Sequence, residues 1–167
     1  MTAPRLMTER LILRMPVMSD LDAFIAFWAT DRAKGMGGPH GADQAWFWFC
    51  HDVAQWHLLN VGGLTIERQS DGAVIGNVAI SQGPVFPETE LGYFLHDGFE
   101  GQGYMAEAAR AMRDWAFGPR GLPTLVSYIS PDNHASARVA EKLGAVIDPD
   151  APGMFPGDRV YRHRRAA

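Results

Sequence analysis

Residues 63–117 restrict the possible folds of this chain more than any other stretch, because three β-rich runs lead through a glycine loop into one long helical pattern. The runs are "GLTIER", "AVIGNVAIS" and "TELGYFLH", and the turn signal "QSDG" joins the first two. Strands this close in sequence predict an antiparallel meander. The helix that follows carries Ala108, Ala109 and Ala116 on its apolar face, and these small side chains predict that it lies close against the sheet.

The elements on either side of this unit are short and alternate between strand and helix. Before it, "RLILRMP" predicts a strand, Ser19 is expected to cap a helix, and a second, aromatic-rich helix is expected to open near Asp43. After it, "TLVSYIS" predicts a buried strand, Asn133 and Gly144 bracket a helix, and "AVID" and "DRVYRHR" predict two final strands. The expected fold is α/β, with a mixed, mostly antiparallel sheet flanked by helices, in a single domain over residues 1–167.

Composition argues against several classes of function. The net charge of −4 and the pI near 5.8 argue against nucleic acid as an obligate partner, because domains that bind it usually have a basic excess. The apolar stretches are far below the roughly 18 residues that a membrane span needs, so no membrane association is expected. Cys50 is the only cysteine and no signal peptide is recognisable, which predicts a cytoplasmic protein. Paired cysteines and histidines spaced i, i+4 do not occur in the sequence, so no metal site is expected.

The glycine loop has two interpretations. Gly101-x-Gly103-x-x-Ala106 fits the fingerprint of a dinucleotide-binding loop, and Asp132, at the end of the next strand, is placed to bind a ribose hydroxyl. A dinucleotide fold, however, begins with the strand that enters this loop and needs further strand–helix units afterwards, whereas only about 60 residues follow here. The second interpretation is a loop that binds another bulky anion, such as a pyrophosphate, outside a dinucleotide fold. Both rest on the same physical basis, because glycines let the backbone approach a bulky anion and the first turn of the helix offers unpaired N–H groups.

Three stretches together carry a resemblance to a known family. They are "TERLILR", "ELGYFL…GFEGQGYMAEA" and "NHASARVAEKLGA", and read in this order the chain resembles the GNAT-type acyl-coenzyme A transferases, in the branch similar to the bacterial ribosomal-protein N-terminal acetyltransferases. The resemblance covers roughly residues 7–163. It implies the GNAT fold and an enzyme that transfers an acetyl group from acetyl-coenzyme A (acetyl-CoA) to a primary amine.

The resemblance also implies which residues bind the cofactor. The backbone amides of the glycine loop would hold the pyrophosphate of coenzyme A, and these belong to Gly101, Gln102, Gly103, Tyr104, Met105 and Ala106. Two residues depart from the family pattern. Met105 replaces a small residue, and Glu100 places a carboxylate beside the pyrophosphate, which is repulsive unless the side chain turns away.

Further along the cofactor, the resemblance implies that the pantetheine arm enters a gap beside the "ELGYFL" strand. There it would pair with Phe94 and Leu95, and the N–H of Leu95 would stabilise the oxyanion of the transition state. Asn133 and Ser136 would face the same arm, and Arg138 would reach its phosphates. The alternative for the last group is structural, with Asn133 only capping a helix and Arg138 solvated.

Catalysis requires a base, because an amine with a pKa near 10.4 is mostly protonated at neutral pH. Strand alternation places Glu90 beside Gly92, where there is room for a substrate, and family members often use a glutamate on this strand; Glu88 and His96 are weaker candidates. Many relatives carry a tyrosine that protonates the leaving thiolate, but the corresponding residue here is Ala140. Water, Ser136 or Tyr128 would then serve, or no acid is needed.

The acceptor is the least determined part of the prediction. In the family, the first two helices and the loop between them wall the acceptor site, and this assigns the loop "KGMGGPHG" and the aromatics Trp46, Trp48 and Phe49 to that role. A protein N-terminus and a small-molecule amine both remain open, as does a homodimer. The competing hypothesis is an acyl-CoA-binding sensor without catalysis, motivated by Ala140 and Glu100.

Overall fold

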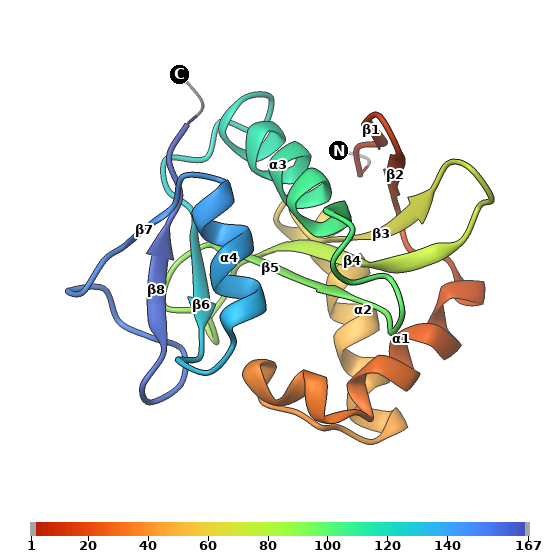
Figure 1. Cartoon of the computed structure of the whole chain (residues 1–167), viewed down its shortest axis with the longest axis horizontal. Helices are drawn as coiled ribbons and strands as arrows, with labels where there is room; N and C mark the ends of the chain where they lie inside the picture. Colours follow the sequence, from red (N-terminus) through yellow and green to blue (C-terminus); the bar gives the residue numbers. More distant parts are fainter. Residues whose placement is uncertain (1–2, 166–167) are drawn as a thin grey trace.

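A single eight-stranded sheet organises the computed structural model of this chain, which describes residues 3–165 (Figure 1). The strand order is β1-β2-β3-β4-β5-β6-β8-β7. The strands are β1 (Leu6–Met7), β2 (Leu11–Arg14), β3 (Gly63–Arg68), β4 (Val74–Ser81), β5 (Glu90–Leu95), β6 (Val126–Ile129), β7 (Val146–Ile147) and β8 (Arg159–Arg162). Only β5 and β6 pair in parallel, so the predicted mixed, mostly antiparallel sheet is confirmed.

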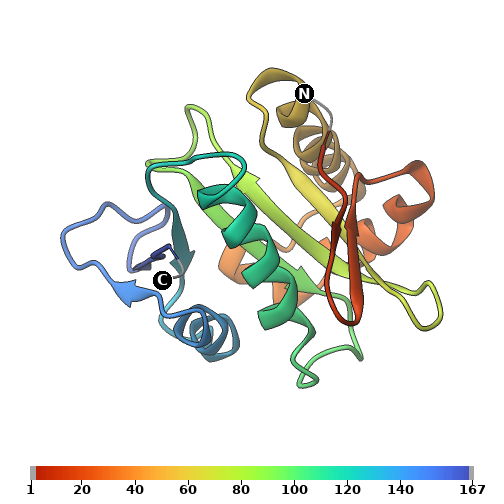
Figure 2. The ribbon, with the colours of Figure 1, turned by 90° about the horizontal axis from the view of Figure 1, so that it is seen from above.

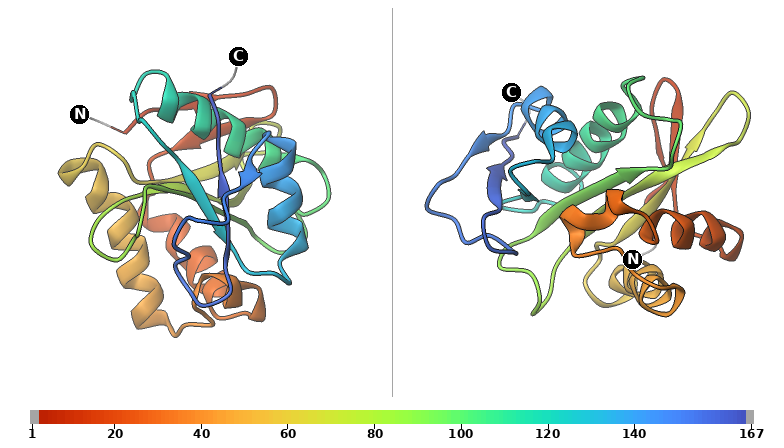
Figure 3. Two further views of the ribbon diagram at one scale, coloured as in Figure 1. Left: turned by 90° about the vertical axis from the view of Figure 1, so that its left-hand side faces the viewer. Right: turned by 60° about the horizontal axis from the view of Figure 1, so that its bottom comes forward.

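Helices cover both faces of this sheet. The α-helices are α1 (Leu21–Trp28), α2 (Ala42–Leu58), α3 (Tyr104–Phe117) and α4 (His134–Lys142), and two short 3₁₀ helices, η1 (Met18–Asp20) and η2 (Asp31–Met36), flank α1. Figure 2 shows α3 crossing β4 and β5, and Figure 3 shows α1 and α2 on the opposite face. Within residues 3–165, none of the helices has the length and apolar character needed to cross a bilayer.

The main core lies between α3 and the meander. Ala108, Ala109 and Ala116 are fully buried, which confirms the close approach predicted from the sequence. Strands β4 and β5 also come close together at Gly76, where a Cβ atom would overlap the carbonyl oxygen of Phe94. Glycine at this position is therefore a requirement of the backbone packing.

A second, aromatic core joins α1 and α2 to the other face of the sheet. Phe24, Phe27 and Phe49 pack there around Phe94 of β5. The helix α2 is buried on one side only, since its aromatic residues divide into three groups: Phe49 and Trp56 are buried, Trp48 is half-buried, and Trp46 and Phe47 are 40% and 63% exposed.

The start of the first helix differs from the prediction. Ser19 does not cap it, because the helix begins two residues later, at Leu21. The carboxylate of Asp20 instead accepts the N–H of Val17 at 3.0 Å and the hydroxyl of Thr65 at 2.8 Å, and it pairs with Arg14. These contacts fix the turn that precedes α1, and one of them depends on Thr65, which is distant in sequence.

The parallel strands β5 and β6 remain paired only at their beginning. Glu90 pairs with Val126, and one residue further on the hydroxyl of Ser127 donates to the carbonyl of Leu91 at 2.6 Å. Beyond this point the two strands separate, and Figure 1 shows β6 running steeply away from β5. The separation opens the sheet in its middle, and the candidate site lies there.

Candidate active site

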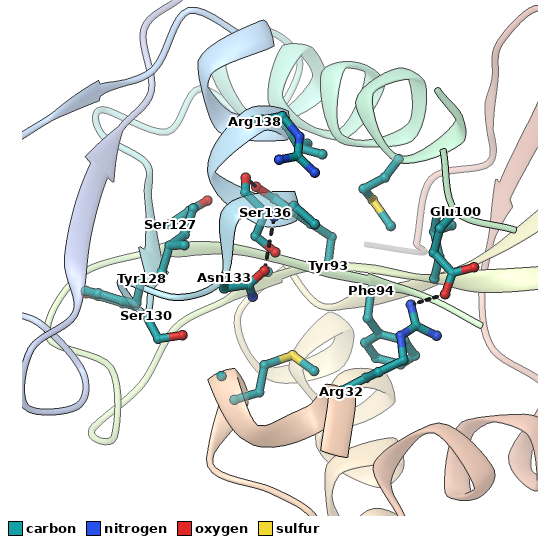
Figure 4. Close-up of a pocket in the computed structure, with 18 of the residues that line it drawn as sticks. Arg32, Tyr93, Phe94, Glu100, Ser127, Tyr128, Ser130, Asn133, Ser136 and Arg138 are labelled. Carbon is teal, nitrogen blue, oxygen red and sulfur yellow. Dashed lines mark hydrogen bonds and ion pairs between the residues drawn. The ribbon is translucent and has the colours of Figure 1, made fainter. Parts of the chain in front are cut away.

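A cleft of about 650 Å³ occupies the opening between β5 and β6. Its walls come from β5, β6, the start of α4, η2 and the glycine loop before α3. Figure 4 shows these elements facing one another across the opening. Most of the residues predicted to bind the cofactor are brought together here from three separate parts of the chain.

The glycine loop forms one end of the cleft. Gly101 and Gly103 have φ angles of +75° and +81°, a region that residues with a Cβ rarely adopt. Gly103 is the residue that precedes the first turn of α3, whose N–H groups have no partner within the helix. The cleft is lined by Gly101, Gly103, Met105 and Ala106; Gln102 and Tyr104 lie outside its lining. Backbone amides at the predicted positions thus face the cleft with the partial positive charge of a helix N-terminus.

The shape of this loop is held by Arg10. Its Nε lies 2.7 Å from Oε2 of Glu107, and its Nη1 donates to the carbonyl of Gln102 at 3.0 Å. The guanidinium also lies over the ring of Tyr104, 4.5 Å from its centroid. These contacts fix the loop against the residue that precedes β2.

Glu100 is paired with a cation. Its Oε1 lies 2.6 Å from Nη2 of Arg32 on η2, and its Oε2 accepts the N–H of Gly98 at 2.8 Å (Figure 4). The ion pair spans the cleft from the glycine loop to η2. The repulsion expected from Glu100 is therefore offset by a partner that the sequence did not indicate.

Two further cations line the cleft on α4. Arg138, a predicted residue, makes no ion pair with another described residue, and the same holds for Lys142. Lys142 was missed, although its spacing of four residues from Arg138 places both side chains on one helical face. The cleft therefore offers unpaired positive charge beside the glycine loop, as an anionic ligand requires.

The edge of β5 that faces the cleft carries free backbone groups. The N–H of His96 donates to the carbonyl of Ile75 on β4 at 2.8 Å, and in an antiparallel pair alternate residues point toward the same neighbour. The N–H of Leu95 therefore points toward β6, where no strand pairs with it. Phe94 lines the cleft while its ring stacks on Phe27 with centroids 3.9 Å apart, so its backbone is the part available for hydrogen bonding.

Residues at the start of α4 form the opposite side of the cleft. Asn133 accepts the N–H of Ser136 at 3.1 Å, which confirms its role as the helix cap, and both residues line the cleft. The hydroxyl of Tyr93 donates to the carbonyl of Ser136 at 3.0 Å. Ala140 is fully buried away from the cleft lining. Among the hydroxyls named as candidate acids, that of Tyr128 accepts the N–H of Glu88 at 2.8 Å, whereas Ser136 Oγ is not engaged by another described residue.

Glu90 lies where β5 and β6 part, and burial raises the pKa of its carboxyl group to about 8. The negative charges of Asp158 and Asp52 raise this pKa further. Glu88 differs, because its two oxygens bind Arg162 at 2.8 and 2.9 Å and this guanidinium holds the pKa of Glu88 below its usual value. Of the two glutamates, Glu90 is therefore the one with a pKa near neutrality.

His96 is less well placed than Glu90. Burial lowers the pKa of His96, its Nδ1 lies 3.3 Å from the carbonyl oxygen of Val74, and its side chain lines neither the cleft nor the cavity described next.

A second cavity, of about 90 Å³, adjoins the cleft on the side of α1 and α2. Glu90, Gly92 and Phe94 line both spaces, so the two spaces adjoin along β5. Trp48 lines the second cavity, as predicted for an acceptor wall, whereas Trp46 and Phe49 do not. Asp52 and Asn77 also line it and were missed, since each looks like an ordinary polar residue within an apolar run.

No cluster of three or more His, Cys, Asp or Glu side chains suited to a metal ion occurs within residues 3–165.

Comparison with known proteins agrees with this arrangement. The family described as "Acetyltransferase (GNAT) domain" matches residues 10–146. The crystal structure of an acetyltransferase from Agrobacterium tumefaciens is 50% identical and has a TM-score of 0.95, with 99% of this chain and 96% of that chain covered. RimL, a ribosomal alpha-N-protein acetyltransferase solved in complex with coenzyme A, is 18% identical with a TM-score of 0.75, over 95% of this chain and 96% of that one.

The uncharacterized protein YkkB of Bacillus subtilis is 38% identical over 96 residues, which are 53% of this chain and 56% of YkkB. The chain thus spans about half the length of the curated relatives it matches. The similarity to RimL is one of fold, so it does not distinguish a ribosomal-protein acetyltransferase from other members.

Proposed function

This chain belongs to the acetyltransferase (GNAT) family, and from that premise we propose that it transfers the acetyl group of acetyl-CoA to a primary amine, by direct attack within a ternary complex. The observation that carries the proposal is the continuity of the site. One cleft runs from the glycine loop, along the free edge of β5, to Glu90, and there it adjoins a second cavity.

The residues of the cleft fit coenzyme A. Amides of residues 101–106 at the start of α3 would bind the pyrophosphate, with Arg138 and Lys142 supplying further positive charge. The pantetheine arm would lie along Phe94 and Leu95, opposite Asn133 and Ser136. Acetyl-CoA would be a cosubstrate that brings the reactive thioester, and the fold shared with RimL, solved with coenzyme A, supports this placement.

The reaction would take place beside Glu90. The amine nitrogen forms a bond to the acetyl carbon, the negative charge on the carbonyl oxygen is stabilised by the N–H of Leu95, and the C–S bond then breaks. The carboxylate of Glu90 takes the proton from the amine, and the thiolate of coenzyme A leaves. The thiolate needs little help, because a thiol with a pKa of about 8.5 is a fair leaving group, so Ser136 or water would suffice as proton donor.

Calorimetric titration with acetyl-CoA, with NAD as control, tests the cofactor assignment. A thiol-release screen against primary amines and short peptides then tests transfer. Saturable binding of acetyl-CoA together with amine-dependent thiol release is expected. Binding of acetyl-CoA without thiol release across the whole panel would favour the alternative, an acyl-CoA-binding sensor without catalysis. The motivation for this alternative is that Ala140 stands where many relatives have a tyrosine.

Three wider assignments belong to the same proposal. Every strand between residues 6 and 162 joins one sheet, which supports a single domain. A cytoplasmic location and a homodimer are proposed from the sequence and the family resemblance. Ultracentrifugation of the purified protein would test the dimer.

A further inference from the structure

The second cavity has an unusual wall, because most of its side chains are flat rings. Trp28 and Trp48 lie nearly parallel, with planes 9° apart and centroids separated by 6.1 Å. The indole nitrogen of each is buried and lacks a hydrogen-bond partner among the described residues. The residues with rings that line the cavity are Phe24, Trp28, Trp48, His51, Phe86, Tyr93, Phe94, Tyr128 and Phe155. Such a wall favours a flat apolar body, and edge or face contacts between rings add to the gain from burial.

The polar part of the cavity carries carboxyl groups and no lysine or arginine from the described residues. Asp52 on α2 accepts a hydrogen bond from Asn77 at 3.1 Å, and its side chain lies so close to Gly63 that a Cβ atom there would overlap it. Asp52 is 8% exposed, so its carboxyl group is fixed in place. Together with Glu90, it makes this cavity attractive to a cation.

The charge of this pair matches one ammonium group. Burial raises the pKa of Asp52 to about 7, and that of Glu90 to about 8 with a contribution from the charge of Asp52. Near neutral pH the two groups therefore carry clearly less than two negative charges. A second ammonium group in the same cavity would lie against rings without a carboxylate of its own, which is costly for a buried charge.

The size of the cavity points to a compact ligand. Its volume of about 90 Å³ is below the roughly 150 Å³ of an apolar cavity that accommodates benzene in an engineered protein, so it limits a ligand to at most one ring, and the rest of the ligand would extend past Glu90 into the adjoining cleft. An extended peptide would also bring more backbone N–H and C=O groups than the few polar groups of this wall, such as the free indole N–H groups of Trp28 and Trp48, can pair. The cavity therefore suits one ring on a short linker better than a chain.

We infer that the acceptor is a compact arylalkyl monoamine, whose single ammonium group is held by Asp52 beside Glu90 while its ring packs against the aromatic side chains of α1 and α2. This inference rests on the proposed function and narrows its substrate class. Glu90 removes the proton from the bound ammonium group, and Asp52 is a specificity-determining residue that contacts the substrate.

A panel of amines tests the substrate class at saturating acetyl-CoA, with thiol release as the readout. The probes are 2-phenylethylamine, 2-cyclohexylethylamine, 1,4-diaminobutane, spermidine and a short peptide with a free N-terminus. The value of kcat/KM is expected to be at least about tenfold higher for 2-phenylethylamine than for the diamine, spermidine or the peptide. The cyclohexyl analogue is expected to fall below the aromatic amine, because it cannot make ring–ring contacts.

The outcomes distinguish this inference from the proposed function. A higher kcat/KM for the diamine, spermidine or the peptide would overturn the arylalkyl assignment and leave the transferase standing. Failure of every amine, with acetyl-CoA still bound, would overturn the proposed function and the inference with it.

Variants on one helix provide the matched comparison. Trp48→Leu removes a ring from the cavity wall, whereas Phe47→Leu changes a neighbour that is 63% exposed and does not line the cavity. Trp48→Leu is expected to lower the preference for 2-phenylethylamine over 1,4-diaminobutane by about tenfold, and Phe47→Leu to leave it unchanged. Because the preference is a ratio measured on one preparation, partial unfolding does not alter it, and an unchanged ratio in Trp48→Leu would overturn the inference.

Discussion

Replacing Glu90 with glutamine tests the catalytic assignment through the pH dependence of the reaction. The pKa of Glu90 is raised to about 8, so its carboxyl group is about one tenth ionised at pH 7 and about nine tenths ionised at pH 9. The base form appears as the pH rises, and the contribution of Glu90 should therefore grow about tenfold over this interval. A glutamate with an ordinary pKa would be ionised throughout and would help most at low pH, where the amine is protonated, so the raised pKa reverses that expectation.

The substrate amine titrates as well, and this has to be separated from the titration of Glu90. An amine with a pKa near 10.4 adds a rising slope to every variant, which cancels in the ratio of wild type to Glu90→Gln. Asp52 and Asp158 face Glu90, as do Tyr93 and Tyr128, but burial raises the pKa values of both tyrosines and they stay protonated below pH 9. The pH dependence of this ratio therefore reports mainly the ionisation of Glu90 and of the carboxyl groups around it.

The assay is thiol release at saturating acetyl-CoA, with kcat/KM for the amine measured between pH 6 and pH 9.5 as chosen limits. At pH 9, Glu90→Gln is expected to be about 100-fold slower or more, since general base catalysis commonly contributes about 10²- to 10⁴-fold. Calorimetry should show an unchanged affinity for acetyl-CoA. A ratio that does not vary with pH would refute the reasoning and remove Glu90 as the base.

Three further predictions concern binding and stability. Gly103→Val should abolish binding of acetyl-CoA in calorimetry, because a branched side chain does not suit φ +81° at the phosphate loop, whereas Gly121→Val, at φ +70° away from the cleft, should bind normally. Arg138→Ala and Lys142→Ala should each weaken binding of coenzyme A on the order of tenfold, and this loss should be smaller at high salt. The control Arg110→Ala, at an exposed residue outside the cleft lining, should have no effect. Equal losses of affinity in all three variants would contradict the phosphate assignment. The folded protein retains a proton on Asp52 up to about pH 7, whereas the unfolded chain releases it near pH 3.8, so stability should fall as the pH rises between these values. Asp52→Asn should flatten this pH dependence of Tm, and a dependence identical to wild type would show that Asp52 does not titrate as described.

The sequence predicted those parts of the fold that depend on short-range patterns. The three strands of the meander pair as expected, although successive residues of β3 and β4 are buried because helices cover both faces of the sheet. Asn133 caps α4 because both partners of that hydrogen bond lie within three residues. Gly144 has φ +77° after the same helix, as its position predicted. Each of these features is determined by neighbouring residues, whose chemistry the sequence displays directly.

The parts that could not be predicted depend on contacts between distant segments. The pairing of Glu100 with Arg32 needs η2 to lie against the glycine loop, and no local pattern indicates this approach. The same is true of Asp20, whose partner Thr65 lies on β3. For α2, the sequence predicted an aromatic-rich helix, but only the packing against α1 decides that Trp48 lines a cavity while Phe47 is exposed.

The place where β5 and β6 separate connects the cofactor cleft with the chemistry of Glu90. Because the hydrogen of the Ser127 hydroxyl goes to the carbonyl of Leu91, the Nε2 of His163, 2.9 Å away, has to carry its own proton and donate to Ser127. Burial and the charge of Arg113 lower the pKa of His163 to about 4, so this histidine stays neutral and keeps donating to Ser127 at neutral pH, which leaves the Ser127 hydroxyl to link β6 to β5. Glu90 lies one residue before the hydrogen bond between Ser127 and Leu91, where β5 and β6 are still paired. Beyond this hydrogen bond the edge of β5 is free. A single local arrangement therefore accounts both for the opening that admits a cofactor arm and for the burial that raises the pKa of the proposed base.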